Sequence, residues 1–225
     1  MELIPNKFYA VITGDIIRSS KLHNEEYTRL NRVLKTNAKL WKEKFKKYVP
    51  YDMDFFRGDS WQVVISNPVI SLRAALFFRL LLNTEMSGIK VDTRVSIGVG
   101  SIEFLPEENI SSGIGGAFTI SGRGLENMSK NQFMSFDIQD EENTKDLMSL
   151  QIITVLIDAI ATKWTPKQAK AIQGALLGLT QDQIASCWNP PIAQPTVTAH
   201  LKRASWDAIK SGIDYFERTL ENINK

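Results

Sequence analysis

Apolar and polar positions along the chain form blocks with two different periods, and these blocks predict both strands and helices. Short apolar or alternating runs, typical of strands, lie at 8–12, in a hairpin at 51–66, at 91–102 and at 132–138. Longer runs with apolar residues at helical spacing predict helices at 25–49, 71–85 and 117–130. The elements follow one another as β-α-β-β-α-β, with one more helix and one more strand.

This order is the split βαβ pattern of ferredoxin-like domains. Residues 1–138 are therefore expected to fold as an α+β domain with an antiparallel sheet. The strand runs are apolar on both sides where they are central and amphipathic where they are peripheral. That pattern favours a sheet covered by helices on one face.

Composition changes near Asp140, and residues 139–225 are predicted to form a second domain that is small and all helical. Helices are expected at about 141–163, 166–177, 180–187 and 194–222. Thr180 and Gln183 have the spacing of a capping box at the start of the third of these helices.

Charge and cysteine content narrow the class of protein. The net charge of +2 is too small to indicate a nucleic-acid partner by itself. The single cysteine, Cys187, cannot form an internal disulfide and favours a reducing cytoplasm. No signal peptide is expected, and residues such as Arg73, Arg79 and Asp158 interrupt the longest apolar runs. We therefore expect a cytoplasmic protein without a membrane partner.

Two aspartates at the edges of apolar runs are the strongest candidates for chemistry. Asp15 follows the run at 8–12, and Asp59 lies in an Arg-Gly-Asp-Ser turn inside the predicted hairpin. Carboxylates on neighbouring strand ends can share a pair of divalent metals, which is the chemistry of phosphoryl and nucleotidyl transfer. The alternative is that each aspartate only stabilises a turn or caps a helix.

The residues after Asp15 extend this candidate site towards the first helix. Backbone N–H groups at this point could cradle a triphosphate, with the side chain of Arg18 or Lys21 assisting. The residues concerned are Ile16, Ile17, Arg18, Ser19 and Ser20. A plain strand-to-helix loop is an alternative interpretation of the same residues.

Four short blocks occur in the order in which class III nucleotidyl cyclases carry them. They are FYAVITGDIIRSSKL, FRGDSWQVVI, TRVSIGVGSI and GGAFTISGRGLE, and they cover roughly residues 7–128. The chain therefore resembles a class III nucleotidyl cyclase domain. The nearest resemblance is to the uncharacterised SatD family, which looks like a reduced cyclase domain with a C-terminal extension.

The resemblance implies a role for several residues. Asp15 and Asp59 fall on the two aspartates that bind Mg²⁺ or Mn²⁺ in cyclases, and the carbonyl of Ile16 would complete a metal shell. Arg57 would supply a substitute cation beside Asp59. Because class III cyclases build their sites between two protomers, the resemblance also implies a homodimer that binds a nucleoside triphosphate.

Other positions match the cyclase pattern in part. Arg94 and Gly100 match the ends of its Arg…Gly strand, with Ser96 in place of the glycine between them. Phe55 stands where cyclases carry the lysine that reads the purine.

The pair of transition-state residues, an asparagine and an arginine, is incomplete. Aligning Arg123 with the arginine places Thr119 at the asparagine position. Aligning Leu125-Glu126 with the usual Leu-Glu instead places Gly124 at the arginine position. Arg123 is therefore the remaining candidate for a catalytic cation.

The segment at 179–204, LTQDQIASCWNPPIAQPTVTAHLKRA, resembles the helix-turn-helix segments of sigma-factor region 4 and response regulators. Ile184, Ala185, Val197 and Leu201 would pack its two helices together. The residues expected to face outward towards DNA are Gln194, Thr196, Thr198, His200, Lys202 and Arg203. Residues 163–225 hold eight Lys or Arg and five Asp or Glu, a modest charge for a DNA-binding module. A helical packing or dimerisation domain is the alternative.

Three functions follow from the sequence. The first is a regulatory protein in which a cyclase-like domain that binds metal and nucleotide is coupled to a DNA-binding helix-turn-helix. The second is an active Mg²⁺- or Mn²⁺-dependent nucleotidyl cyclase or nucleotidyltransferase, which the two carboxylates favour. The third is a dimeric scaffold without enzymatic activity. The incomplete Asn–Arg pair and Phe55 favour regulation over catalysis.

Overall fold

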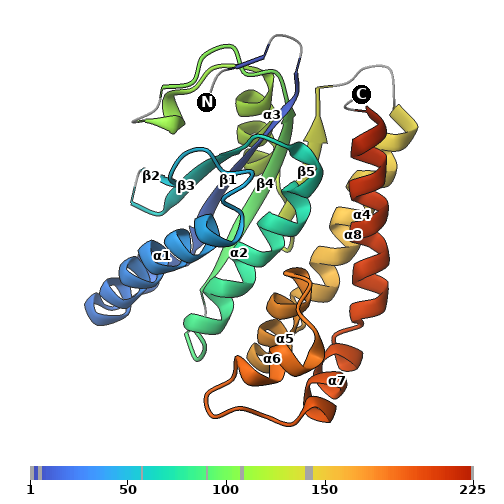
Figure 1. Cartoon of the computed structure of the whole chain (residues 1–225). Coiled ribbons are helices and arrows are strands. Elements are labelled where there is room, and N and C mark those ends of the chain that lie inside the picture. Colours follow the sequence, from blue (N-terminus) through green and yellow to red (C-terminus); the bar gives the residue numbers. More distant parts are fainter. Residues whose placement is uncertain are drawn as a thin grey trace.

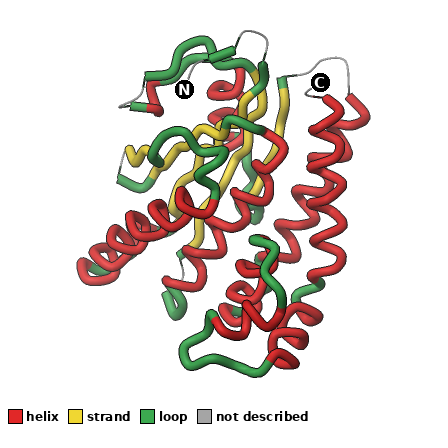
Figure 2. The backbone as a smooth tube through the Cα atoms, viewed as in Figure 1, coloured by secondary structure: helices red, strands yellow, loops and turns green. Residues whose placement is uncertain are grey.

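The computed structural model describes residues 3–4, 7–56, 58–89, 91–106, 109–139 and 144–223. They form a twisted five-stranded sheet with helices against both faces, and a group of helices beside it (Figure 1). The C-terminal helices occupy one side of the molecule, and the sheet with its own helices occupies the other (Figure 2). The chain is thus an α+β protein, as its element order predicts.

The sheet is mixed, which corrects the expectation of an antiparallel one. Its strands have the order β2-β3-β1-β4-β5, and β1 to β4 pair antiparallel as the split βαβ pattern predicts. The fifth strand pairs parallel to β4, because α3 crosses over the sheet between them and returns the chain in the same direction. The strands are β1 (Tyr9–Ile17), β2 (Asp54–Phe56), β3 (Ser60–Ile65), β4 (Asp92–Gly100) and β5 (Met134–Ile138).

Helices cover both faces of the sheet, so the expectation of one covered face is wrong. On β1, Ala10 and Ile12 join the main core under α1 (Asn24–Lys44) and α2 (Ser71–Glu85). Tyr9 and Val11 point the other way, into a smaller cluster with residues of α3 (Gly116–Glu126). This alternation follows from the period of two in a strand.

Glycines allow α3 to lie close to the sheet. A Cβ added to Gly98 of β4 would come within 2.4 Å of the Ser121 backbone nitrogen in α3. One added to Gly124 of α3 would come within 2.3 Å of the Ser96 hydroxyl oxygen. Gly98 of β4 and Gly124 of α3 therefore allow this helix to pack closely against the sheet, whereas Gly122 of the same helix faces open space.

The C-terminal part is helical, with one correction. The single helix expected at 194–222 is two helices, because Ser205 adopts a left-handed conformation with φ of 58°. The break lets α7 pack Val197 and Leu201 against its neighbours while α8 turns Ile213 and Phe216 towards the core. The helices are α4 (Thr144–Ala161), α5 (Pro166–Leu176), α6 (Gln181–Ser186), α7 (Gln194–Arg203) and α8 (Trp206–Ile223).

These helices pack on the sheet part, and a separate helix-turn-helix domain is not shown. One cluster of buried apolar residues includes members of the sheet, α1, α2 and all of α4 to α8. Arg73 of α2 donates to both Glu217 carboxylate oxygens, at 2.7 and 3.0 Å, and to the Leu176 carbonyl. The division of the chain at 138/139 stays a prediction.

None of the helices in the described ranges has the length and hydropathy that a membrane-spanning segment needs.

A buried arginine joins the two parts. Arg79 of α2 has no exposed side-chain surface and donates to Asp92 of β4 at 2.9 Å and to Asp158 of α4 at 2.6 Å. Its guanidinium also lies 4.6 Å from the ring centre of Phe133. Burial lowers the pKa of Arg79, but the two carboxylates outweigh it and the pKa is raised.

Replacing Arg79 by Met should destabilise the fold by about 3–5 kcal/mol, because Asp158 would lose the cation that compensates its burial. Urea unfolding followed by circular dichroism measures this loss. The matched control is Lys42→Ala, which removes a surface pair to Asp52 with side chains 36% and 89% exposed and should cost less than about 1 kcal/mol. Equal losses for the two variants would contradict the proposed role of the buried network.

Candidate functional site

The two candidate aspartates lie at the same end of the sheet. Asp15 sits near the end of β1, opposite Ser60 of β3 and Arg94 of β4. Asp59 immediately precedes β3, and its carbonyl accepts a hydrogen bond of 2.9 Å from the backbone N–H of Ile16. Strand pairing thus places residues that are distant in sequence next to one another.

Asp15 is engaged by an arginine from the neighbouring strand. Arg94 donates from Nε to Oδ1 at 3.0 Å and from Nη2 to Oδ2 at 2.5 Å, the two-point contact that suits a guanidinium and a carboxylate. The hydrogen bond to Asp15 raises the pKa of Arg94 against the opposing effect of burial. The side chains are 29% and 24% exposed, so solvent still reaches the pair.

Asp59 has a different partner. The hydroxyl of Ser19 donates to Asp59 Oδ2 at 2.7 Å, and Ser19 is buried. Ser19 begins a short 3₁₀ turn, η1 (Ser19–Lys21), which follows Arg18 in a left-handed conformation with φ of 65°. A non-glycine residue rarely adopts this conformation, and such residues cluster at functional sites. Arg57, the predicted cation beside Asp59, lies outside the described residues.

The donor set fits a divalent cation only in part. Carboxylate oxygens are the ligands that Mg²⁺ and Mn²⁺ favour, and Asp59 keeps one oxygen that no described residue hydrogen-bonds. Both oxygens of Asp15, however, are taken by Arg94. No group of three or more His, Cys, Asp or Glu side chains with the geometry of a metal site occurs among the described residues. A cation would therefore have to share Asp15 with Arg94.

No hydrogen bond or ion pair among the described residues joins Arg123 to Asp15 or Asp59. Arg123 is exposed on α3 and lines a pocket of about 420 Å³ with Asn127, Asp137 and Gln151, a pocket that includes neither Asp15 nor Asp59. Its catalytic role stays a prediction.

Two residues of the site could not be assigned a role from the sequence. Arg94 matches a motif position but has no role predicted for it, and Thr93 was not predicted to belong to the site. The hydroxyl of Thr93 donates to the Asp15 carbonyl at 2.9 Å and accepts from Trp61 Nε1 at 3.0 Å, which fixes the end of β1. The signal that could have found Arg94 is its place in the alternating strand at 91–102, on the face opposite to Val95. Only the register of β1 with β4 assigns it to Asp15.

The second candidate site is the pair of helices α6 and α7. Ile184, Ala185, Val197 and Leu201 are buried, as the helix-turn-helix pattern predicts. Among the residues expected to face outward, Thr196, Thr198, Lys202 and Arg203 are exposed, whereas Gln194 and His200 are half-buried.

Gln181 at the start of α6 connects the two helices. Its Oε1 accepts hydrogen bonds from Thr198, at 2.6 Å, and from Gln194 Nε2. Thr198 and Gln194 are therefore held by the protein itself, while Thr196, Lys202 and Arg203 have no such partner among the described residues.

His200 lies in an electropositive setting. Its ring stacks on Trp188 with a centroid distance of 5.6 Å and an interplanar angle of 5°. A cleft of about 450 Å³ between α7 and the start of α5 is lined by His200, Arg203, Lys167 and Ser87. Burial lowers the pKa of His200, and the charges of Lys167 and Arg203 lower it further.

Comparison with known proteins gives little. No family model matches the chain, and no curated protein matches it. Among solved structures, the crystal structure of the guanylyl cyclase Cya2 is similar over 60% of this chain and 77% of that chain, with 14% sequence identity and a TM-score of 0.43. A likeness of this size does not establish a shared activity.

His200 should titrate below its ordinary pKa of about 6.5, and Arg203→Ala or Lys167→Ala should move its pKa upward. Since the folded-state pKa is lowered, the contribution of His200 to stability is present above about pH 6.5 and is lost as the pH falls through the folded-state value. Proton NMR measures the titration directly, because the chain has only two histidines. Lys145→Ala, on α4, is the control and should leave the titration unchanged.

Proposed function

We propose that this chain binds a nucleoside triphosphate together with Mg²⁺ or Mn²⁺ at the end of the sheet that carries Asp15 and Asp59, and that it acts as a regulatory protein. The observation that carries the proposal is the backbone hydrogen bond from Ile16 to Asp59, which places Asp59 across from the residue that follows Asp15 near the end of β1. Kinship with the SatD family is part of the same proposal.

The residues around the carboxylates suit a phosphate chain. The η1 turn follows directly after β1, so its backbone and the exposed side chains of Arg18 and Ser20 lie next to Ser19 and Asp59. The divalent ion, when bound, would neutralise phosphate charge, with Asp15, Asp59 and the carbonyl of Ile16 as its protein ligands. Arg94 balances the charge of Asp15 in its absence.

Binding without turnover is favoured over catalysis. Phe55, at the position of the purine-reading lysine, is an apolar side chain that is 39% exposed and cannot donate a hydrogen bond to a base. Arg123 lines a pocket whose other residues include neither Asp15 nor Asp59. An active nucleotidyl cyclase or nucleotidyltransferase is the alternative, and it would require the homodimer that the resemblance implies, with Arg123 supplied by the second protomer. A scaffold with neither activity is the remaining alternative.

In a thermal-shift measurement, ATP or GTP with Mn²⁺ at about 100 times Kd should stabilise the protein by about 2.7 kcal/mol, or about 5–10 °C in Tm. Asp15→Asn and Asp59→Asn should each remove most of this shift, because a neutral amide is a poor ligand for a hard cation. The control is Asp52→Asn, whose side chain is 89% exposed on the surface. Wild-type protein that no nucleotide stabilises would be a scaffold or a DNA-binding protein only.

DNA binding by α6 and α7 is the second part of the proposal. It is supported by the exposed Thr196, Lys202 and Arg203 on α7, beyond the hydrogen bonds that join Gln181 to Thr198. Cations near the end of such a helix suit phosphates, and small polar residues near its start suit base edges. The turn at Asn189-Pro190-Pro191 is longer than in the compact motif.

Lys202→Ala should weaken binding to all duplex sequences alike and reduce the salt dependence, as log K against log salt, by about one unit. Thr196→Ala should instead change which sequence is preferred. Binding to a pool of random duplexes across a salt series separates the two effects. Lys210→Ala on α8 is the control for a charge outside the two helices. If the wild-type protein shows no salt-sensitive binding to DNA at low salt, DNA binding is contradicted and α6 and α7 serve only to pack the C-terminal helices.

A further inference from the structure

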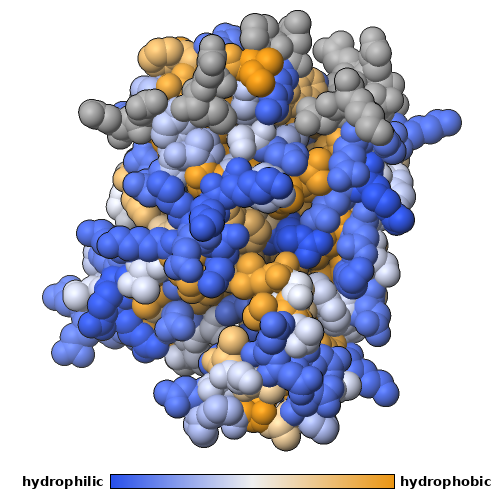
Figure 3. Space-filling view, viewed as in Figure 1, coloured by the Kyte–Doolittle hydropathy of each residue, from blue (hydrophilic) through white to orange (hydrophobic). Residues whose placement is uncertain are grey.

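A cavity of about 440 Å³ lies where the sheet part meets the C-terminal helices. Its walls are mostly apolar and come from α1, α2, α5 and the α6 region; they include Leu40, Phe77, Leu81, Leu177, Leu179 and Ile184. Figure 3 shows hydrophobic surface near the middle of the face that Figure 1 presents. A volume of this size, an apolar lining and a place between two parts of a protein are all typical of small-molecule sites.

The polar groups of this cavity are mainly donors. Lys44 at the end of α1 and Lys170 of α5 line it, and no Asp or Glu is found among the described residues of its wall. Lys44 Nζ is 3.6 Å from Glu43 Oε1, but that carboxylate is 69% exposed and screened by water. Gln173 already uses its amide Nε2 to donate to the Leu80 carbonyl at 2.8 Å.

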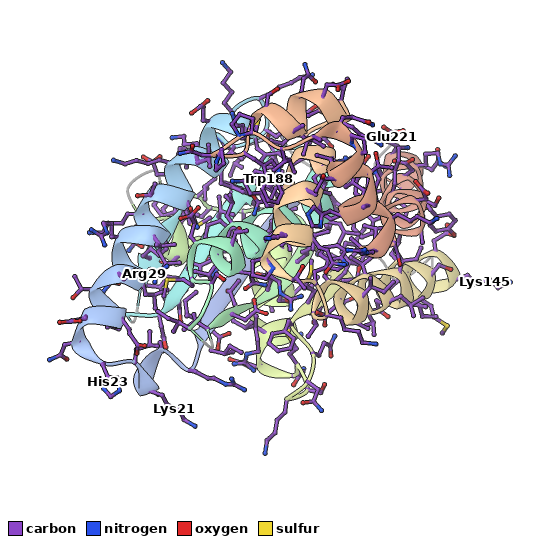
Figure 4. All side chains as sticks on the ribbon, turned by 90° about the horizontal axis from the view of Figure 1, so that it is seen from below. Lys21, His23, Arg29, Lys145, Trp188 and Glu221 are labelled. Atoms are coloured by element: carbon purple, nitrogen blue, oxygen red, sulfur yellow. The ribbon has the colours of Figure 1, made fainter. Side chains whose placement is uncertain are left out.

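Trp188 adds an unsatisfied donor. It lines the same cavity, and its indole Nε1 is buried with no hydrogen-bond partner. Figure 4 places Trp188 among the side chains between the ribbon of α1 and those of the C-terminal helices. Lys170 Nζ lies 5.0 Å from the centre of its ring. A buried donor without an acceptor is unfavourable, so a ligand that brings an acceptor gains by pairing with it.

We propose that this cavity binds a small amphipathic anion, with its carboxylate head between Lys44, Lys170 and the Trp188 indole and its apolar body against the leucine-rich wall. Two ammonium groups and an unpaired N–H favour a negatively charged acceptor. The apolar lining favours a hydrocarbon body over a sugar or a nucleotide. The assignment is independent of the nucleotide and DNA sites proposed above.

Because the cavity lies between the sheet part and the C-terminal helices, a bound ligand would affect how the two parts are held together. Leu40 and Lys44 belong to α1, whereas Ile184, Cys187 and Trp188 belong to α6 and the turn after it. A ligand held there contacts both parts at once and favours the arrangement in which they are joined.

Calorimetric titration of the full chain with decanoate tests the proposal, with decanol as the uncharged probe of similar size. Decanoate should bind saturably and more tightly than decanol. Lys170→Gln and Lys44→Gln should each weaken decanoate binding at least fivefold and leave decanol unaffected. Lys35→Gln, an exposed lysine on α1 away from the cavity, is the matched control and should change neither affinity.

Cys187 provides a second readout, because it is the chain's single cysteine, is exposed and lines the cavity. Saturating decanoate should slow its alkylation by iodoacetamide severalfold in the wild type and less in Lys170→Gln at the same concentration. Decanol that binds as tightly as decanoate would overturn the role of the lysines. Absence of both saturable heat and cysteine protection at millimolar decanoate would overturn the site.

Discussion

The buried guanidinium of Arg79 is the interaction on which the arrangement of this molecule depends. Removing a charge from water is costly, and the cost is offset only when every donor finds an acceptor. Arg79 finds Asp92 at the start of β4 and Asp158 on α4, while Asp158 in turn accepts from the backbone N–H of Phe133 at 2.8 Å. These contacts fix α2, β4 and α4 relative to one another, so the C-terminal helices take a defined position beside the sheet.

Strand β4 connects the buried network of Arg79 to the candidate site. Asp92, held by Arg79, is two residues before Arg94, and Arg94 reaches across the strand pair to Asp15. The ion pair at the centre of the fold and the ion pair at the candidate site therefore lie on one short segment of one strand. A shift in the register of β4 by one residue would turn Arg94 to the opposite face and separate it from Asp15.

The spacing of apolar residues in the sequence predicts individual helices and strands well. It does not predict contacts between residues that are far apart in the chain. The helix at 71–85 is found as predicted because apolar residues fill it, and the strand around Val95 because apolar residues alternate there. In the sequence, Arg79 is only a charged residue that interrupts an apolar run. Its ion pair could not be predicted, because its partner Asp158 is 79 residues away. The break at Ser205, the parallel pairing of β5 and the cavity beside Trp188 likewise depend on which distant surfaces must pack together.

The two carboxylates at the end of the sheet differ in a way that bears on what they can bind. Asp15 is balanced by Arg94, whereas Asp59 accepts only a neutral hydroxyl from Ser19 among the described side chains. Asp15, Asp59 and Arg94 together carry one net negative charge rather than two, which is little for holding a bare divalent cation in water. A triphosphate brings several anionic oxygens of its own and offers Arg94 an alternative partner. In the proposed site, metal and nucleotide would therefore bind together more strongly than either would alone.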